Sequence, residues 1–434
     1  MRKTQSKKLV LVICAAVAIL GSMLSVNPVK APPTVIDVYT WGFVNGGTNV
    51  ISPPIQSAVN WASVNPPGPF TFRVHTGTYQ EQVTIPSALA GSTFVAVGSV
   101  TLDGASCSLP YGFELVGTNL VTVKGFTVEH FGEAGIYLHK DWNGNIPSSQ
   151  NEVRNNIIQN NCGSGILLSD SHMNDIKSNT VQSNGKIGVF VDNGLGNRIK
   201  SNTVDGNAMS GIEYHVAPRT IVIGNTVTNN GQDGLNADGY SYGATIRGNT
   251  FDHNSWNGIN VLSGLNTIKD NEISNNGFNG IMLAQGDNNV VWENWIYLNG
   301  MDGIFVTYSW WNWDSSDRNS IRFNRVYGNR HGVFIYSSDW NMVWNNTIYD
   351  NLFNGIQITG ESPPILAEEN TVYSNALQSN GLGYPPPSDW VGVDLYYDGW
   401  YGWLNNHWGT SSANDNNFGT WAVGFSFGTP PLPT

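Results

Sequence analysis

Four residues with acid–base side chains fall at matching places in a repeated sequence. Asp192, His215 and Asp238 follow one another at intervals of 23 residues, and Glu213 lies two residues before His215. Carboxylates beside an imidazole raise its pKa, and crowding among acids raises one of theirs, so such a group suits general acid and base catalysis. Glycoside hydrolysis uses two carboxylates roughly 5 to 10 Å apart. This chemistry requires a fold that brings consecutive repeats side by side.

The repeat that must position these residues extends from residue 151 to about residue 375. Two series of Asn, five residues apart, recur at steps of 22 to 30 residues, and a Gly follows every pair except the last. The first series is Asn156, Asn179, Asn202, Asn225, Asn249, Asn271, Asn294, Asn324, Asn346 and Asn370, and the second extends from Asn161 to Asn375. Self-similarity at this period indicates stacked units that each contact their neighbours.

Within a unit the apolar residues alternate with polar ones in short runs, as at Ile176, Val181, Val189 and Val191. Period two, broken by Asn, Gly and Ser, is typical of short strands. No long amphipathic helix follows the first fifty residues, which excludes the helical repeat arrays. The sequence therefore predicts a coil of parallel strands, one turn per repeat of about 23 residues, with the Asn series forming ladders at its corners.

The chain resembles the NosD-like right-handed parallel β-helix proteins within the wider pectin-lyase-like group. The resemblance rests on the N-T-V-x-x-N repeats and on the segments 55–59, 74–83, 100–104, 394–397 and 405–410. It implies an all-β, single-stranded right-handed parallel β-helix over nearly the whole chain. The motifs of polygalacturonases, pectate lyases and alginate epimerases are not found, so the resemblance does not establish a reaction.

Three regions follow from this interpretation. Residues 1–30, with four early Lys and Arg before an apolar run, are expected to be a signal peptide or an N-terminal membrane anchor. Residues 34–410 form the β-helix, and a short helix at Pro53–Ala62 is expected to cover its open end. Residues 411–434 form a C-terminal cap and tail.

The composition limits the partners. Charged residues are 12% of the chain, the net charge is −12, and the chain carries 49 Gly. This acidity argues against nucleic acid and against anionic membrane as the main partner. Cys107 and Cys162 are either a disulfide or free buried thiols, and free thiols are favoured because the two residues fall about two coils apart.

Residues near the acid–base group and a set of aromatic residues are candidates for binding sugar. Phe190 and Asn236 flank the acids, Tyr297 and Tyr327 belong to a row that continues to Tyr349 and Tyr373, and an insertion carries Trp310, Trp311 and Trp313. Flat aromatic faces are suited to sugar recognition. A second row is basic and includes Arg154, Lys177, Lys200, Arg247 and Lys269; it either binds a polyanion or pairs with neighbouring acids.

Two functions fit these features. The first is an exported protein that binds and cleaves polysaccharide, as hydrolase or lyase, with Glu213 as general acid or base, His215 as its partner, and Asp192 and Asp238 positioning the charge. The second is a non-catalytic adhesion or structural protein of the cell surface. No cofactor is expected, although Asp192, His215 and Asp238 offer ligands that calcium would accept. Both functions imply a glycan partner and a secreted or cell-surface location, and both leave the oligomeric state open.

Overall fold

The computed structural model describes residues 33–40, 42–45, 48–50, 54–65, 68–308, 314–359, 367, 369–378, 380, 395–398, 407–408 and 417–418. The chain divides into two units, Met1–Thr34 and Val35–Thr434, and the second contains the fold. The expected signal or anchor segment at 1–30 lies outside the described residues, as do Trp310, Trp311 and Trp313. Among the residues that are described, no helix is long and apolar enough to cross a membrane.

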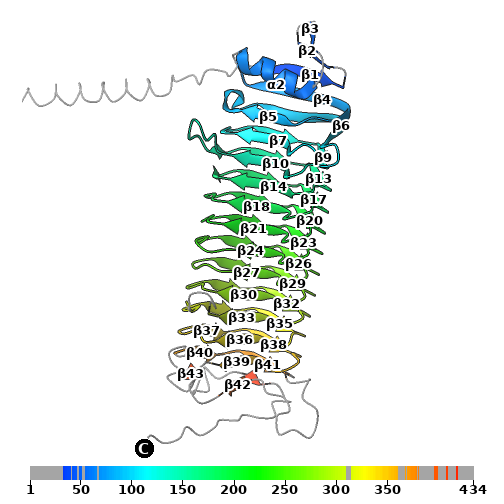
Figure 1. Cartoon of the computed structure of the whole chain (residues 1–434). Coiled ribbons are helices and arrows are strands. Elements are labelled where there is room, and N and C mark those ends of the chain that lie inside the picture. Colours follow the sequence, from blue (N-terminus) through cyan, green and yellow to red (C-terminus); the bar gives the residue numbers. More distant parts are fainter. Residues whose placement is uncertain are drawn as a thin grey trace, which may run out of the picture. The chain divides into compact units, whose positions relative to one another are not determined.

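Parallel strands stacked in three columns build this unit, and each regular coil contributes one strand to each column (Figure 1). One column is a sheet of 13 described strands. Its strands are β5 (Val83–Pro86), β7 (Tyr111–Val116), β10 (Ala134–His139), β14 (Ser164–Ser169), β18 (Val189–Asp192), β21 (Ile212–His215), β24 (Leu235–Ala237), β27 (Ile259–Val261), β30 (Ile281–Ala284), β33 (Ile304–Thr307), β36 (Val333–Tyr336), β39 (Ile356–Thr359) and β42 (Leu395–Asp398).

The other two columns belong to a sheet of 29 described strands. Its first column contains β8 (Thr122–Lys124), β12 (Glu152–Arg154), β16 (Asp175–Lys177), β19 (Arg198–Lys200), β22 (Ile221–Ile223), β25 (Thr245–Arg247), β28 (Thr267–Lys269), β31 (Val290–Trp292), β34 (Ser320–Arg322), β37 (Met342–Trp344), β40 (Thr371–Tyr373) and β43 (His407–Trp408). Its second column contains β9 (Thr127–Glu129), β13 (Ile157–Gln159), β17 (Thr180–Gln182), β20 (Thr203–Asp205), β23 (Thr226–Thr228), β26 (Thr250–Asp252), β29 (Glu272–Ser274), β32 (Trp295–Tyr297), β35 (Arg325–Tyr327), β38 (Thr347–Tyr349), β41 (Ala376–Gln378) and β44 (Asn417–Phe418).

The N-terminal coils differ from the regular ones. The long strands β4 (Phe70–Tyr79) and β6 (Thr93–Asp103) pair with each other, and β6 then pairs with both β8 and β9. The remaining elements are β1 (Thr34–Tyr39), β2 (Gly42–Asn45), β3 (Thr48–Val50), α2 (Pro54–Val64), the short 3-10 helix η1 (Ser87–Leu89), and the two-stranded pair β11 (Ser148–Ser149) and β15 (Ser171–His172).

The capping helix is confirmed as α2, which begins one residue later than expected and ends two residues later. Its buried face includes Ile55 and Val59, and its first turn is held by Glu81 from the turn between β4 and β5. The Glu81 carboxylate accepts the backbone N–H groups of Ile55 (3.1 Å) and Gln56 (2.8 Å), which a helix N-terminus leaves without intrahelical partners. Burial nevertheless raises the pKa of Glu81 to about 7.

The core consists of stacked inward-facing side chains, one from each short strand of the 29-stranded sheet and two from strands of the 13-stranded sheet, such as Val189 and Val191 on β18. In the first column of the 29-stranded sheet, Ile176, Ile199, Val222 and Ile246 lie one above another and are fully buried. β-Branched residues suit this position because they pack well against neighbours on a pleated surface. The alternation seen in the sequence is therefore the alternation between core and solvent.

Buried Asn side chains join consecutive coils. At Asn179, for example, Nδ2 donates to the carbonyl of Val153 (2.9 Å), while Oδ1 accepts the backbone N–H and the Nδ2 of Asn156 (both 3.1 Å). Each such Asn satisfies main-chain groups that the corners would otherwise leave buried and unpaired. The residue with positive φ is the one before the Asn, such as Ser178 (φ 54°), and not the Asn itself.

The structure corrects the last members of the two Asn series. Asn346 bonds to Asn375 and Asn351 bonds to Asn380, each across 29 residues. Asn370 instead follows Asn341 in a third ladder. The last repeat of each ladder therefore contains an insertion. The sequence did not reveal it, because the ladders are about five residues apart and a residue of one ladder, taken for a member of the next, keeps the spacing nearly regular.

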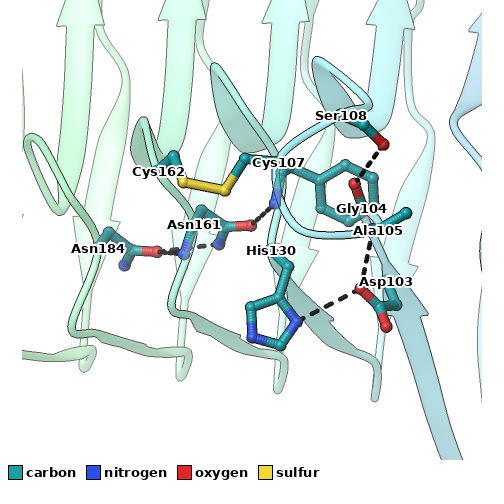
Figure 2. Close-up of a disulfide and its surroundings, with 10 residues drawn as sticks. Asp103, Gly104, Ala105, Cys107, Ser108, His130, Asn161, Cys162 and Asn184 are labelled. Atoms are coloured by element: carbon teal, nitrogen blue, oxygen red, sulfur yellow. Dashed lines mark hydrogen bonds and ion pairs between the residues drawn. A yellow bond between two sulfur atoms is a disulfide. The ribbon is translucent and has the colours of Figure 1, made fainter.

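Cys107 and Cys162 form a disulfide, so the expectation of free buried thiols is wrong (Figure 2). Cys162 is exposed, at a corner two coils after the one that precedes Cys107. The loop that carries Cys107 reaches across the intervening coil through three consecutive residues with positive φ, of which Cys107 is the last (φ 69°), and its N–H donates to the carbonyl of His130. Its Cα then lies 6.1 Å from that of Cys162.

Candidate functional site

The outward face of the 13-stranded sheet presents its side chains in two rows, as the sequence predicted. The first row contains Glu114, Tyr137, Leu167, Phe190, Glu213, Asn236, Asn260, Met282, Phe305, Phe334 and Gln357. In the second row, Ser169, Asp192 and His215 follow one another in register. Along the first row, Glu213, Asn236 and Asn260 form a polar segment between Phe190 on one side and Met282 and Phe305 on the other.

Glu213 and His215 form the centre of this segment on strand β21. His215 Nε2 lies 2.8 Å from Glu213 Oε1 and 3.7 Å from Asp238 Oδ2. The hydrogen bond to Glu213 raises the pKa of His215, with smaller contributions from Asp238 and Asp192, while partial burial acts in the opposite direction. The Glu213 side chain is only 10% exposed, whereas those of His215 and Asp238 are 31% and 48% exposed.

The strand that carries this pair begins where the backbone packs closely against the next coil. It begins beside Gly211, where a Cβ atom would lie 2.4 Å from Val227 Cγ1 and 2.7 Å from Asn230 Nδ2. Only a glycine fits where the strand approaches its neighbour so closely. The backbone that aims Glu213 and His215 outward is therefore fixed by packing.

Asp192 and Phe190 reach the pair from the preceding strand, β18. Asp192 is the direct partner of His215 in the register, although its carboxylate makes no ion pair with His215 within 4.0 Å. The Phe190 ring meets the His215 ring edge to face, with centroids 5.0 Å apart. Asn236 pairs with Glu213 in the next coil. The structure thus brings together the four acid–base residues and both flanking residues that the sequence selected.

Asp233 is a further carboxyl group of this site that the sequence analysis did not identify. It is 3% exposed, and its Oδ1 accepts the backbone N–H and the Nδ2 of Asn257, both at 2.9 Å. Burial raises the pKa of Asp233 to about 6, and the charge of Glu213 adds to this effect. Hydrogen bonds from Asn257 and from the side chain of Asn260 act in the opposite direction and lower the pKa of Asp233.

Asp233 was not recognised because its position, directly before the Gly of each repeat, carries Asn in some of the other coils. The same position holds Asn257 and Asn279, whose side chains accept backbone N–H groups of the following coil. In the sequence, an Asp at a position that other repeats fill with Asn looks like a conservative replacement. The sequence did contain one indication: Asp233 comes directly before a predicted strand, two coils after the coil that carries Asp192.

A second Glu–His pair on the same sheet provides a contrast. His139 Nε2 lies 3.1 Å from Glu114 Oε1, but Glu114 also accepts from Thr84 Oγ1 (2.8 Å) and Gln82 Nε2 (2.9 Å). The hydrogen bond from His139 lowers the pKa of Glu114. Because every oxygen of this pair is saturated by protein donors, it resembles a structural ion pair more than a reactive one.

The tyrosines predicted to bind sugar stack on each other. Tyr297, Tyr327 and Tyr349 lie in consecutive coils, with ring centroids 5.1 and 4.8 Å apart and nearly parallel planes. Neighbouring rings therefore cover both faces of Tyr327, which leaves edges and hydroxyl groups for a ligand. Tyr373, which was expected to continue this row, lies instead beside Trp344 in the first column of that sheet.

Within the described ranges, no group of three or more His, Cys, Asp and Glu side chains is arranged to hold a metal ion. The basic row pairs with acids only in part: Arg154 and Lys177 both contact Glu152, and Lys269 contacts Glu293 at 3.1 Å, whereas Lys200 and Arg247 form no ion pair among the described residues.

Comparison with known proteins identifies the class. The family model described as the right-handed beta helix region matches residues 87–194, 145–295 and 257–423, and the chain belongs to this family. A search of curated proteins found no match.

Solved structures with the same fold include two with different activities. The A-module of the mannuronan C-5 epimerase AlgE4 from Azotobacter vinelandii is 13% identical, with a TM-score of 0.53 over 82% of this chain and 95% of that one. The surface adhesin PfbA of Streptococcus pneumoniae is 14% identical, with a TM-score of 0.52 over 71% of this chain and 89% of that one. At such identities the likeness shows the pectin-lyase-like β-helix fold and no more.

Proposed function

We propose that this protein is exported and binds a polysaccharide along the outward face of the 13-stranded sheet, where Glu213 and His215 transfer a proton during cleavage of the chain. The observation that carries the proposal is the 2.8 Å hydrogen bond between Glu213 and His215, which lies where the aromatic row of the sheet is interrupted by polar residues. The hydrogen bond orients the imidazole ring and raises the pKa of His215, which suits a group that transfers a proton.

The exposures refine the roles of the two residues. His215 is the more exposed, so it is the group that meets the substrate, and Glu213 orients the ring and sustains its charge. Asp238 and Asp192 on the neighbouring coils place further negative charge beside the ring. Phe190 and Asn236 are positioned to contact the sugar next to the reacting bond.

The charge of the site favours a neutral polysaccharide and hydrolysis. Among the described residues, no Lys or Arg contacts Asp192, Glu213, Asp233 or Asp238. Elimination from a uronate requires stabilisation of negative charge next to the carboxylate, and a cluster of acids opposes it. We therefore favour hydrolysis over elimination as the reaction of this site.

Export is supported by the disulfide between Cys107 and Cys162, because disulfides persist in oxidising compartments outside the cytoplasm. The basic and apolar start of the sequence suits a signal peptide or anchor. Of the two structural relatives described above, one is a mannuronan epimerase and the other a surface adhesin, so the fold is used both by an enzyme that acts on a polysaccharide and by a protein of a cell surface.

The test is a panel of neutral and acidic polysaccharides, assayed for binding, for new reducing ends and for the absorbance of unsaturated uronates. Glu213→Gln and His215→Ala are expected to abolish product formation and to leave binding largely intact. Gln182→Ala, on the other sheet, is the matched control and is expected to behave as wild type.

Three results would argue against the proposal. Product formation that survives both substitutions would exclude this site. Binding without products from any glycan would favour the non-catalytic surface role. Absence of binding across the panel would reject a glycan partner altogether.

A further inference from the structure

A second surface, on the 29-stranded sheet, carries aromatic and arginine side chains over its last regular coils. We call it the arginine–aromatic patch. It consists of Lys269, Trp292, Arg322, Trp344 and Tyr373 in the first column, and of Trp295, Arg325, Tyr297, Tyr327 and Tyr349 in the second. It belongs to a different sheet from Glu213 and His215, and the inference below does not depend on the proposed function.

The scaffold does not require these aromatic residues. Earlier coils place Lys177 and Lys200 in the row of Trp292 and Trp344, and Gln159 and Gln182 in the row of Tyr297 and Tyr327. Those coils have the same three strands and the same Asn ladders. The rings are therefore a local addition to a framework that is stable with polar residues at the same positions.

The rings and cations form a continuous stack along the solenoid. Arg322 lies between Trp292 and Trp344, with its guanidinium carbon 5.5 Å from each ring centroid. Lys269 Nζ covers the other side of Trp292 at 3.5 Å, and Tyr373 stacks on the other side of Trp344 at 5.7 Å. Each side chain is held in place by its neighbours, so the surface is organised before any ligand arrives.

The two arginines keep hydrogen-bonding capacity toward solvent. Neither Arg322 nor Arg325 forms an ion pair within the part of the chain that the structure describes, and Arg325 donates only to the hydroxyl of Tyr349. The Arg322 guanidinium lies over the rings of Trp292 and Trp344, and a guanidinium carries N–H donors that can bind a carboxylate through two parallel hydrogen bonds. The indole N–H of Trp344 is also buried without an acceptor among the described residues.

Exposed apolar side chains border the patch. Trp295 is 41% exposed and Phe323 is 47% exposed, and Leu298 and Met342 beside them are 54% and 42% exposed. Trp, Tyr and Arg with Met and Phe are the residues enriched at the centres of protein–protein interfaces, where Lys and Glu are depleted.

A sugar is a poorer fit to the patch than a protein. Sugar rings bind aromatic side chains through a free ring face, and the axial faces of Trp292, Trp344 and Tyr327 are already covered. What remains are ring edges, methyl and methylene groups, and cations. The net charge of −12 opposes acidic groups over the protein as a whole, so an acidic group would be attracted locally, where Arg322 and Arg325 carry positive charge without an ion pair among the described residues.

We propose that the arginine–aromatic patch is a docking site for a partner protein, which it binds through an acidic segment that places a carboxylate against Arg322 and Arg325 and apolar side chains against Trp295 and Phe323. Binding forms charge-assisted hydrogen bonds beside a desolvated aromatic surface, and the affinity falls as salt is added.

The test uses the full disulfide-bonded protein and a fluorescein-labelled peptide of twelve residues in which Glu alternates with Leu and Phe. A matched peptide has Gln in place of every Glu. We expect the acidic peptide to bind at least tenfold more tightly by fluorescence anisotropy, and Arg322→Gln and Arg325→Gln each to weaken it about tenfold, the usual cost of one charge-assisted hydrogen-bond pair. Arg247→Gln is the control, because Arg247 lies in the row of Arg322 but outside the stack, and it is expected to change affinity less than twofold.

Several outcomes would overturn the proposal: no binding of the acidic peptide, equal binding of the two peptides, or equal loss in the Arg247→Gln variant. Displacement of the acidic peptide is also measured with an acidic polysaccharide and with unlabelled protein. A polysaccharide that binds in an Arg322-dependent way while the peptide does not would reassign the patch to glycan, and Arg322-dependent self-association in sedimentation without peptide binding would reassign it to a second copy.

Discussion

The substitution Asp233→Asn tests whether the site contains a carboxyl group that costs stability. Asp233 is buried beside Glu213, and its folded-state pKa is about 6 against an ordinary value of 3.8. Between these two pH values the native state binds more protons than the unfolded state. The free energy of unfolding therefore rises as pH falls from about 6 to about 4, and the full cost of the ionised group is present above pH 6.

The expected size follows from this difference. One pKa unit corresponds to about 1.4 kcal/mol, so a shift of about two units means that ionised Asp233 destabilises the native protein by about 3 kcal/mol at pH 8. An Asn removes the charge and keeps the acceptor for both N–H groups of Asn257.

The assay is chemical denaturation of wild type and Asp233→Asn at pH 8 and at pH 4.5. The variant is expected to be more stable by about 3 kcal/mol at pH 8 and by clearly less at pH 4.5. Asp350→Asn, at an exposed turn, is the control and should stay within about 0.5 kcal/mol at both pH values. The reasoning is refuted if Asp233→Asn is no more stable than wild type at pH 8, or if its advantage is the same at both pH values. A variant that gains stability but loses turnover would indicate that the carboxyl group is retained for function.

Three further predictions concern other parts of the fold. Glu213→Gln should lower the pKa of His215 toward its ordinary value, since the hydrogen bond that His215 donates to Glu213 is the main cause of its elevation; an unchanged NMR titration of the ring would contradict this. Glu81→Ala should lower the free energy of unfolding by about 2 to 4 kcal/mol, because two buried N–H groups of α2 lose their acceptor. In the same denaturation series, Glu81→Gln should be destabilised by only part of this amount. Cys107→Ser should cost about 4 kcal/mol by the chain-entropy estimate for a loop closed across 55 residues, and a reductant should weaken wild type to the same level without affecting the variant.

The rows of the candidate site could be predicted from the sequence because a strand alternates strictly and a ladder repeats. Once Asn179 and Asn202 set the step, Asp192 and His215 had to lie in neighbouring strands on the same face, as their register shows. The same regularity caused the error at Asn370. Three ladders about five residues apart give similar spacings, so only the hydrogen bonds show which Asn continues which ladder.

By itself, the sequence determined the β-helix, its period, its capping helix and the outward positions of Glu213, His215 and Asp238, because these depend on local periodicity and on backbone hydrogen bonds that repeat with every coil. Only the tertiary structure decided that Cys107 reaches Cys162 across a coil, that Asp233 is buried beside Glu213, and that the ring faces of Tyr327 are covered by its neighbours. Each of these depends on the direction and burial of a side chain in the assembled stack, which the spacing of residues along the chain does not specify.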